Sequence, residues 1–159
     1  MNIWKYYDGD LKYLNITDHL YEKEIAKTNA KTAYSYAVKH GKFPEGEKAI
    51  ASNAEYSYYY ANKILKGVFK LGEKAIASNA YYAYQYAFYV LKNKFKLGEP
   101  AIAKNDYYAY LYATLLLKGP FPLGEPAIAR NDYFAALYTS ISLKKDFYLN
   151  GKLIYKYKG

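Results

Sequence analysis

The chain has no cysteine, two histidines, one tryptophan and one methionine among its 159 residues. The absence of cysteine excludes a disulfide-stabilised scaffold, a thiolate zinc site and a cysteine nucleophile. Arg130 is the only arginine among 23 basic residues, so lysine supplies almost all of a formal net charge of +9. Because lysine binds phosphate mainly as a point charge, any nucleic-acid binding is expected to be independent of base sequence.

Long apolar runs are absent as well. No segment approaches the roughly 20 apolar residues that a membrane-spanning helix needs. The opening MNIWKYYDGDLK lacks the uninterrupted apolar core of a signal peptide. We therefore expect a cytoplasmic protein with no membrane partner, long enough to form one domain with its own core.

An internal repeat dominates what is present. The sequence Gly-Glu-(Lys/Pro)-Ala-Ile-Ala recurs every 26 residues, starting at Gly46, Gly72, Gly98 and Gly124. A degraded copy begins near Glu22. The spacing predicts five copies, at 22–45, 46–71, 72–97, 98–123 and 124–149. A single copy cannot bury its apolar face, so stability must come from packing between neighbouring copies.

Each copy is expected to form a short helix followed by a longer one. Glutamate and proline at the start suit the first helical turn. An asparagine that tolerates a tight corner and can cap the next helix recurs at Asn29, Asn53, Asn79, Asn105 and Asn131. In copy 46–71 the long helix is predicted over 54–66. The Gly or Asn after its last lysine, at Gly67, Asn93 and Gly119 in successive copies, is expected to supply the terminal turn.

Invariant columns predict the core. Tyrosine never changes at Tyr60, Tyr86, Tyr112 and Tyr138, and residues four before and four after it are also large. This spacing places them on one face of a helix. A neighbouring column of small residues allows close helix packing, and Phe69, Phe95, Phe121 and Phe147 are expected to fill the connections.

These features predict an all-α fold, an α-solenoid of about five short-helix/long-helix repeats with a period of 26. The array spans 22–149, between an N-terminal cap at 1–21 and a C-terminal cap or tail at 150–159. Asp8-Gly9 and Asn150-Gly151 each predict a small β-hairpin in these flanks.

Residues 98–113, GEPAIAKNDYYAYLYA, resemble tyrosine-rich tandem repeats of bacteriophage and bacterial proteins, and the resemblance covers about 22–149. That family carries no assigned activity. The resemblance implies a viral or mobile-element origin, and small phage proteins often block host defences, so it implies a host protein as partner in the host cytoplasm.

No catalytic constellation is evident. His19 and His40 lie outside the repeated positions, and no ligand spacing for a metal or glycine-rich phosphate loop is present. The repeated glutamate, at Glu47, Glu73, Glu99 and Glu125, is interpreted as compensation of helix dipoles. We expect no enzyme activity, no cofactor and no metal.

A repeated lysine at the end of each long helix leaves two interpretations open. It offsets the helix dipole and pairs with the next copy's glutamate, or it forms a ladder that binds phosphates of nucleic acid or nucleotides. The candidate anion-binding residues are Lys66, Lys92, Lys118, Lys144 and Arg130.

Columns that vary between copies suggest a binding surface. They lie at positions i, i+4, i+7 and i+11 of each long helix, away from the invariant column, and include aromatic and apolar residues. Exposed apolar patches mark interaction sites, and tyrosine is a favoured anchor. Packing under the caps or against the short helices is the alternative. The candidate protein-binding residues are Tyr59, Tyr81, Gln85, Phe88, Tyr107, Leu111, Tyr133 and Leu137.

The sequence thus favours a non-enzymatic binding protein, a phage factor that blocks or sequesters a host protein. A binder of nucleic acid or anionic nucleotides through the lysine ladder is the first alternative. A self-associating structural protein is the second.

Overall fold

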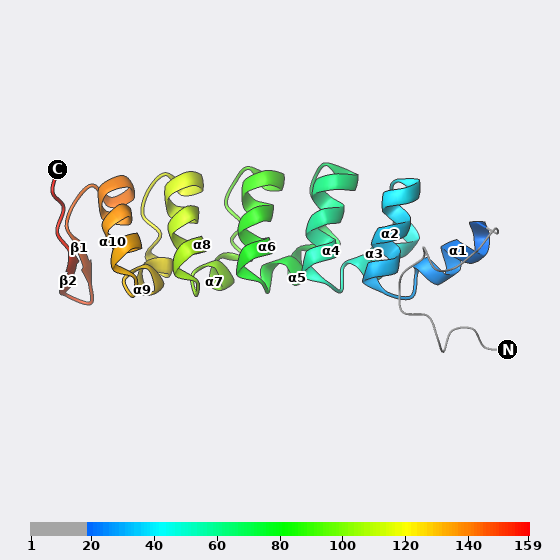
Figure 1. Cartoon of the computed structure of the whole chain (residues 1–159), viewed down its shortest axis with the longest axis horizontal. Helices are drawn as coiled ribbons and strands as arrows, with labels where there is room; N and C mark the ends of the chain where they lie inside the picture. The colour runs from blue at the N-terminus through cyan, green and yellow to red at the C-terminus, as the bar shows by residue number, and fades with distance from the viewer. Residues whose placement is uncertain (1–18) are drawn as a thin grey trace. The chain divides into compact units, whose positions relative to one another are not determined.

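The computed structural model describes residues 19–159, with side chains from Glu22 onward. The predicted hairpin at Asp8-Gly9 lies outside this range, as does most of the N-terminal cap. The described chain is mostly helical, with one two-stranded antiparallel sheet (Figure 1). It divides into two compact units, unit 1 (Met1–Ala75) and unit 2 (Ile76–Gly159).

Unit 1 contains the degraded copy and the copy 46–71, and both form a helix pair as predicted. Its helices are α1 (His19–Ala26), α2 (Ala30–His40), α3 (Glu47–Ile50) and α4 (Ala54–Tyr59), with a π-helical turn at Tyr60–Leu65 and 3-10 turns at Pro44–Gly46 and Lys70–Gly72. Helix α5 (Glu73–Ala77) crosses the boundary between the units.

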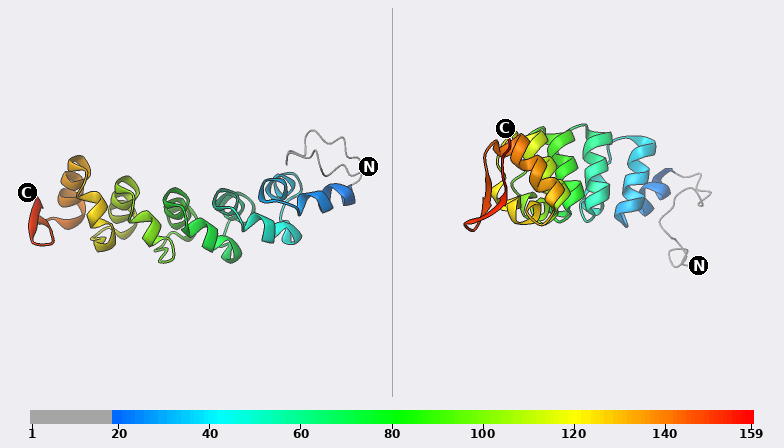
Figure 2. Two further views of the ribbon diagram at one scale, coloured as in Figure 1. Left: turned by 90° about the horizontal axis from the view of Figure 1, so that it is seen from below. Right: turned by 60° about the vertical axis from the view of Figure 1, so that its left-hand side comes forward.

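Unit 2 holds three long-helix positions side by side, with the short helices at one end of them (Figures 1 and 2). Its α-helices are α6 (Ala80–Gln85), α7 (Glu99–Ile102), α8 (Asp106–Leu111), α9 (Glu125–Ile128) and α10 (Asp132–Tyr138). The π-helical turns are Tyr86–Leu91, Tyr112–Leu117 and Thr139–Leu143, and a 3-10 turn precedes α9 at Pro122–Gly124.

The corner asparagines are N-caps, as predicted. In all five copies the asparagine has an extended backbone and its side chain accepts a hydrogen bond from the backbone N–H three residues later. In copy 98–123, for example, Asn105 Oδ1 accepts from Tyr108 N at 3.0 Å. This bond satisfies one of the unpaired N–H groups at a helix start.

The prediction of a continuous α-helix ended by Gly or Asn was wrong for the later copies. The long helix of the degraded copy, α2, is α-helical throughout and ends at Gly41. In each of the four later copies the long helix is α-helical only in its first half and then widens into a π-helical turn. In copy 98–123 the backbone N–H of Lys118 closes this turn on the carbonyl of Ala113. The left-handed residue that ends the helix is the lysine itself, with φ between 50° and 52° at Lys66, Lys92, Lys118 and Lys144.

The invariant tyrosine and the neighbouring small residues form the core, as predicted, whereas the large residues four before and four after that tyrosine are only half-buried. Tyr60, Tyr86, Tyr112 and Tyr138 are fully buried, as are the small residues of the neighbouring column, and Phe43 and the four repeated phenylalanines are at most 4 % exposed. The repeated glycine lies against that phenylalanine. A Cβ on Gly98 would lie 2.5 Å from Cδ1 of Phe95, so no other residue fits there without displacing the ring.

The C-terminal hairpin is present. Strands β1 (Phe147–Leu149) and β2 (Lys152–Tyr155) pair antiparallel around Asn150-Gly151, whose φ values are 52° and 78°. Two positive φ values define the type I′ turn that Asn-Gly favours. Strand β2 packs against α10, so the hairpin covers the C-terminal end of unit 2 (Figure 2).

Candidate functional site

Ten aromatic side chains of unit 2 form one continuous set of ring contacts, which we call the aromatic row. They come from the three long-helix positions of this unit. The row consists of Tyr81, Tyr82, Tyr84, Phe88, Tyr89, Tyr107, Tyr108, Tyr110, Tyr133 and Phe134.

Tyr108 and Phe134 connect one helix of the row to the next. The ring of Tyr84 stacks on Tyr108 with centroids 5.8 Å apart and planes 27° apart. The ring of Tyr110 stacks on Phe134 at 5.3 Å and 16°. Tyr107 contacts both Tyr108, at 5.2 Å, and Phe134, at 5.7 Å. Aromatic pairs in such geometries are worth about 0.5–1.5 kcal/mol beyond the burial of their area.

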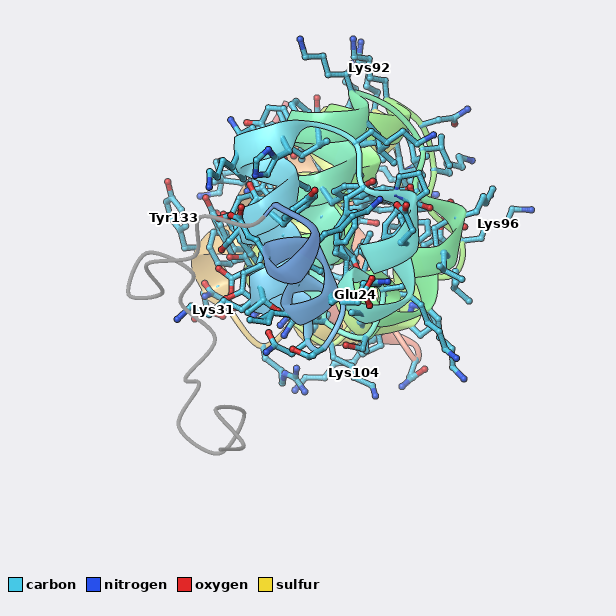
Figure 3. The ribbon with its side chains drawn as sticks, turned by 90° about the vertical axis from the view of Figure 1, so that its right-hand side faces the viewer. Glu24, Lys31, Lys92, Lys96, Lys104 and Tyr133 are labelled. Carbon is cyan, nitrogen blue, oxygen red and sulfur yellow. The ribbon has the colours of Figure 1, made fainter. Side chains whose placement is uncertain are left out.

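Four tyrosines of the row keep a large part of their surface in solvent. At the second residue of each α-helix the exposed fraction rises from 37 % at Tyr81 to 46 % at Tyr107 and 68 % at Tyr133, and Tyr89 in the π-helical turn after α6 is 54 % exposed. Figure 3 shows Tyr133 projecting outward from the ribbon. The row is therefore braced from inside by half-buried rings and presents tyrosine rings to solvent.

The three long-helix segments that carry the row contain no basic residue. Within 80–91, 106–117 and 132–143 the only charged side chains are Asp106 and Asp132, although the chain as a whole carries +9. The lysines of unit 2 come from the connecting segments and from the C-terminal hairpin and tail. Lys92, Lys96 and Lys104 project from other sides of the unit than Tyr133 (Figure 3). The row is thus an aromatic surface without cations of its own.

Burial holds the inner tyrosines of the row neutral. It raises the pKa of Tyr84 to about 12, and the neighbouring Tyr89 and Tyr107 hydroxyls act in the same direction. Burial also raises the pKa of Tyr108. A neutral phenol keeps its O–H as a donor for a partner across the physiological pH range.

Four of the predicted protein-binding residues belong to the row: Tyr81, Phe88, Tyr107 and Tyr133. Gln85, Leu111 and Leu137 are half-buried. Tyr59 lies in unit 1, where its ring contacts Tyr34 at 6.2 Å and Tyr58 at 5.2 Å.

Sequence reasoning missed the inner rings of the row. It assigned Tyr82, Tyr108 and Phe134 to the packing face and made no assignment for Tyr84 and Tyr110. Tyr84 and Tyr110 stand three residues after Tyr81 and Tyr107, and this i, i+3 spacing was the available signal.

The invariant tyrosines form a second, buried constellation with the repeated glutamates. Tyr112 Oη donates to Glu99 Oε1 at 3.0 Å and accepts the backbone N–H of Phe95 at 2.9 Å. The same two bonds join Tyr138 to Glu125 and Phe121, and Tyr60 to Glu47 and Phe43. Burial is the main cause that raises the pKa of Tyr60, to about 12, and those of Tyr112 and Tyr138.

These bonds give the repeated glutamate a specific role that dipole compensation alone does not describe. The carboxylate anchors the hydroxyl of a tyrosine 13 residues later in the chain. We call this pair of hydrogen bonds the clasp, because it joins the connection and the start of the short helix to the long helix that follows.

The lysine ladder does not pair with the glutamates. Lys66, Lys92, Lys118 and Lys144 are exposed, and none of them forms an ion pair with a carboxylate between residues 22 and 159. Arg130 is also exposed, and its guanidinium donates to the backbone carbonyl of Lys104 at 3.4 Å. The predicted anion-binding residues are therefore available to solvent.

His40, the one histidine whose side chain the structure describes, belongs to an ion-pair cluster in unit 1. His40 Nε2 lies 3.4 Å from the buried carboxylate of Glu22, which also accepts from Lys39 at 2.8 Å. Within the described residues no three His, Asp or Glu side chains gather as a metal site would require. The side chain of His19 lies outside the described part.

No helix between residues 19 and 159 has the length and apolar character needed to cross a bilayer. Comparison of the chain with family models, with curated proteins and with solved structures found no match in any of the three.

Proposed function

We propose that the chain is a non-enzymatic helical-repeat protein that binds another protein through the aromatic row of unit 2. The observation that carries this proposal is the row itself. Its exposed rings are packed on inner rings, and the segments 80–91, 106–117 and 132–143 that carry them contain no lysine or arginine. The exposed rings are Tyr81, Tyr89, Tyr107 and Tyr133.

The chemistry of the row suits a protein surface better than a polyanion. Tyrosine offers a large rigid apolar area and a hydroxyl for a hydrogen bond, which makes it a frequent hot-spot residue. Single-stranded nucleic acid also stacks on aromatic rings, but it needs cations beside them to neutralise phosphates. The only charges on the helices of the row are Asp106 and Asp132, which repel phosphate.

We further propose that the five copies stack as an α-solenoid, because the copies repeat the same buried columns and three of them, 46–71, 98–123 and 124–149, repeat the same clasp. The partner is proposed to be a host protein that this factor blocks or sequesters. This part of the proposal rests on the resemblance of the repeats to those of bacteriophage and bacterial proteins.

The test is an affinity capture from host lysate after nuclease treatment, followed by binding measurements with the recovered protein. Tyr107→Ala combined with Tyr133→Ala removes two exposed rings of the row and is expected to weaken binding at least about 100-fold, as loss of two hot-spot residues does. Circular dichroism should show unchanged helicity.

Tyr148→Ala is the matched control, because Tyr148 is a 54 % exposed tyrosine in β1, outside the row. It is expected to bind like the unaltered chain. Equal binding by the row variant and the control would refute the proposal.

A second candidate, a polyanion binder, has one observation in its favour. Lysine occupies a left-handed position at the end of all four later long helices, where glycine would be less strained. Titration with single-stranded and duplex oligonucleotides at two salt concentrations tests it. Binding that falls steeply with salt and is lost in Lys92→Gln, Lys118→Gln and Lys144→Gln together would establish it; no binding at low salt would remove it.

A further inference from the structure

A cavity of about 420 Å³ lies beside the short helices of unit 2, away from the aromatic row. Its apolar wall comes from two prolines, one leucine and two alanines, and its charged side chains are one lysine and one arginine. The lining residues are Pro100, Ala103, Lys104, Leu123, Pro126, Ala127 and Arg130. No carboxylate belongs to this set.

Both cations are available to a ligand. Lys104 and Arg130 are exposed, and neither forms an ion pair with a carboxylate in the described part of the chain. The guanidinium of Arg130 makes a single long bond of 3.4 Å to the carbonyl of Lys104, which places the two residues together at the cavity. Leu123 is 53 % exposed, so the apolar wall is also accessible.

The chemistry of this cavity is particular to the last two copies. The third residue of the repeat is lysine in the two preceding copies, at Lys48 and Lys74, and becomes proline at Pro100 and Pro126. The seventh residue changes in the opposite direction. It is serine at Ser52 and Ser78, and becomes cationic at Lys104 and Arg130.

These paired changes leave the scaffold as it was. The buried columns and the N-cap asparagine are the same in all four copies. The change from lysine to proline supplies an apolar wall, and the change from serine to a basic residue places a cation beside it. The second change also introduces the only arginine of the chain.

We propose that this cavity binds an acidic peptide segment of a partner protein, in which carboxylates flank an apolar side chain. The guanidinium of Arg130 can hold a carboxylate through two parallel bonds, whereas the ammonium of Lys104 holds a second one as a point charge. The apolar side chain would lie against Pro100, Leu123 and Pro126. The inference does not depend on the aromatic row, because Lys104 and Tyr133 project from different sides of unit 2 (Figure 3).

Three fluorescein-labelled heptapeptides test the chemistry by fluorescence anisotropy. The first, Gly-Asp-Glu-Phe-Glu-Asp-Gly, has both the carboxylates and the apolar side chain. The second replaces the acids by their amides, and the third replaces phenylalanine by glycine. The first peptide is expected to bind at least about tenfold more tightly than either of the others, since it alone uses both parts of the cavity.

The decisive variant rewrites the last two copies with the residues of the two copies before them. Pro100→Lys, Lys104→Ser, Pro126→Lys and Arg130→Ser together leave the net charge unchanged, and every new residue already stands at the equivalent position of another copy. Binding of the first peptide is expected to fall at least about tenfold, with circular dichroism unchanged.

Lys94→Gln combined with Lys96→Gln is the control, because it removes two exposed cations of unit 2 that lie outside the cavity lining and outside the lysine ladder. This control is expected to retain binding. Equal binding by the rewritten chain and the original would overturn the proposal, because the peptide would then respond to net charge alone.

Two further outcomes would also overturn the proposal of a peptide-binding cavity. Equal affinity for the first and third peptides would show that the apolar wall takes no part. Displacement of the first peptide by an equal concentration of oligothymidylate or pyrophosphate would make this a general anion site and not a peptide site.

Discussion

Tyr112 donates its hydroxyl hydrogen to Glu99 Oε1 at 3.0 Å while its oxygen accepts the backbone N–H of Phe95 at 2.9 Å. One fully buried phenol therefore satisfies a backbone donor in the connection and a carboxylate at the start of the next short helix. The tyrosine is invariant because it closes this clasp as well as filling the core.

Tyr112→Phe is expected to lower the free energy of unfolding by about 1–3 kcal/mol, because it leaves a buried N–H and a part-buried carboxylate without their partner. Urea denaturation followed by circular dichroism measures the change. Tyr110→Phe is the control, since Tyr110 is half-buried and its hydroxyl has no hydrogen bond within the described residues. If Tyr112→Phe lowers the free energy of unfolding no more than Tyr110→Phe does, the hydrogen bonds of the clasp do not stabilise the fold.

The repeat, the helix pairs, the N-caps, the core columns and the C-terminal hairpin could all be predicted from the sequence. Each is encoded locally or by a fixed spacing, as Asn105 and Asn150-Gly151 illustrate. The clasp could not, because an i, i+13 contact such as Glu99 to Tyr112 leaves no periodic signal within one helix. The π-helical turn was also missed, since an i, i+4, i+8 pattern does not distinguish a widened turn from a regular one.

Gly98→Ala is expected to destabilise the chain by about 1–3 kcal/mol through overpacking. The new Cβ would lie 2.5 Å from Cδ1 of Phe95 and 2.8 Å from Cβ of Ala83, and both neighbours are buried. Thermal unfolding provides the measurement. The matched change Gly119→Ala meets no atom closer than 3.9 Å and should shift stability by less than about 0.5 kcal/mol. A similar decrease in stability in both variants would show that glycine is needed at position 98 for its backbone conformation and not because a Cβ would clash with Phe95.

Lys92→Gly is expected to stabilise the fold by about 0.5–1 kcal/mol despite the greater freedom of glycine in the unfolded chain. The φ of Lys92 is 50°, a left-handed conformation that costs a residue with a Cβ more than it costs glycine. Lys96→Gly removes the same charge from an exposed position without a positive φ, and should not stabilise. A stabilisation of equal size in both variants would assign the effect to charge.

The candidate surface was predictable only in part. Tyr81, Tyr107 and Tyr133 were identified because they lie on the helix stripe that varies between copies while the scaffold stays constant, and all three are exposed rings of the row. The fourth exposed ring, Tyr89, was missed. The inner support of these rings depends on ring contacts between successive copies, such as Tyr84 on Tyr108, which a single sequence does not specify. The sequence shows that these helices carry no basic residues. Only the structure shows which side chains share the surface, and therefore that the exposed tyrosines have no cation from these helices beside them.

We expect the chain to lose stability at a lower alkaline pH than it would if loss of lysine charge were the only effect. Burial, with the Glu47 carboxylate acting in the same direction, raises the pKa of Tyr60 from 10 to about 12, and the pKa values of Tyr112 and Tyr138 move the same way. A raised folded-state pKa stabilises the fold fully below the unfolded value of 10. This contribution is lost as pH rises through 10 to 12, because the unfolded chain releases its proton first.

Urea midpoints measured across this range, together with the ultraviolet absorbance of the phenolate, provide the test. The midpoint should fall between pH 10 and pH 12 as the phenolate appears. Tyr60→Phe is the control, because it removes one of the titrating hydroxyls and should make the decline shallower by on the order of 1–2 kcal/mol. An identical decline in the variant and the unaltered chain would mean that the clasp tyrosines do not govern alkaline stability, and that loss of lysine charge does.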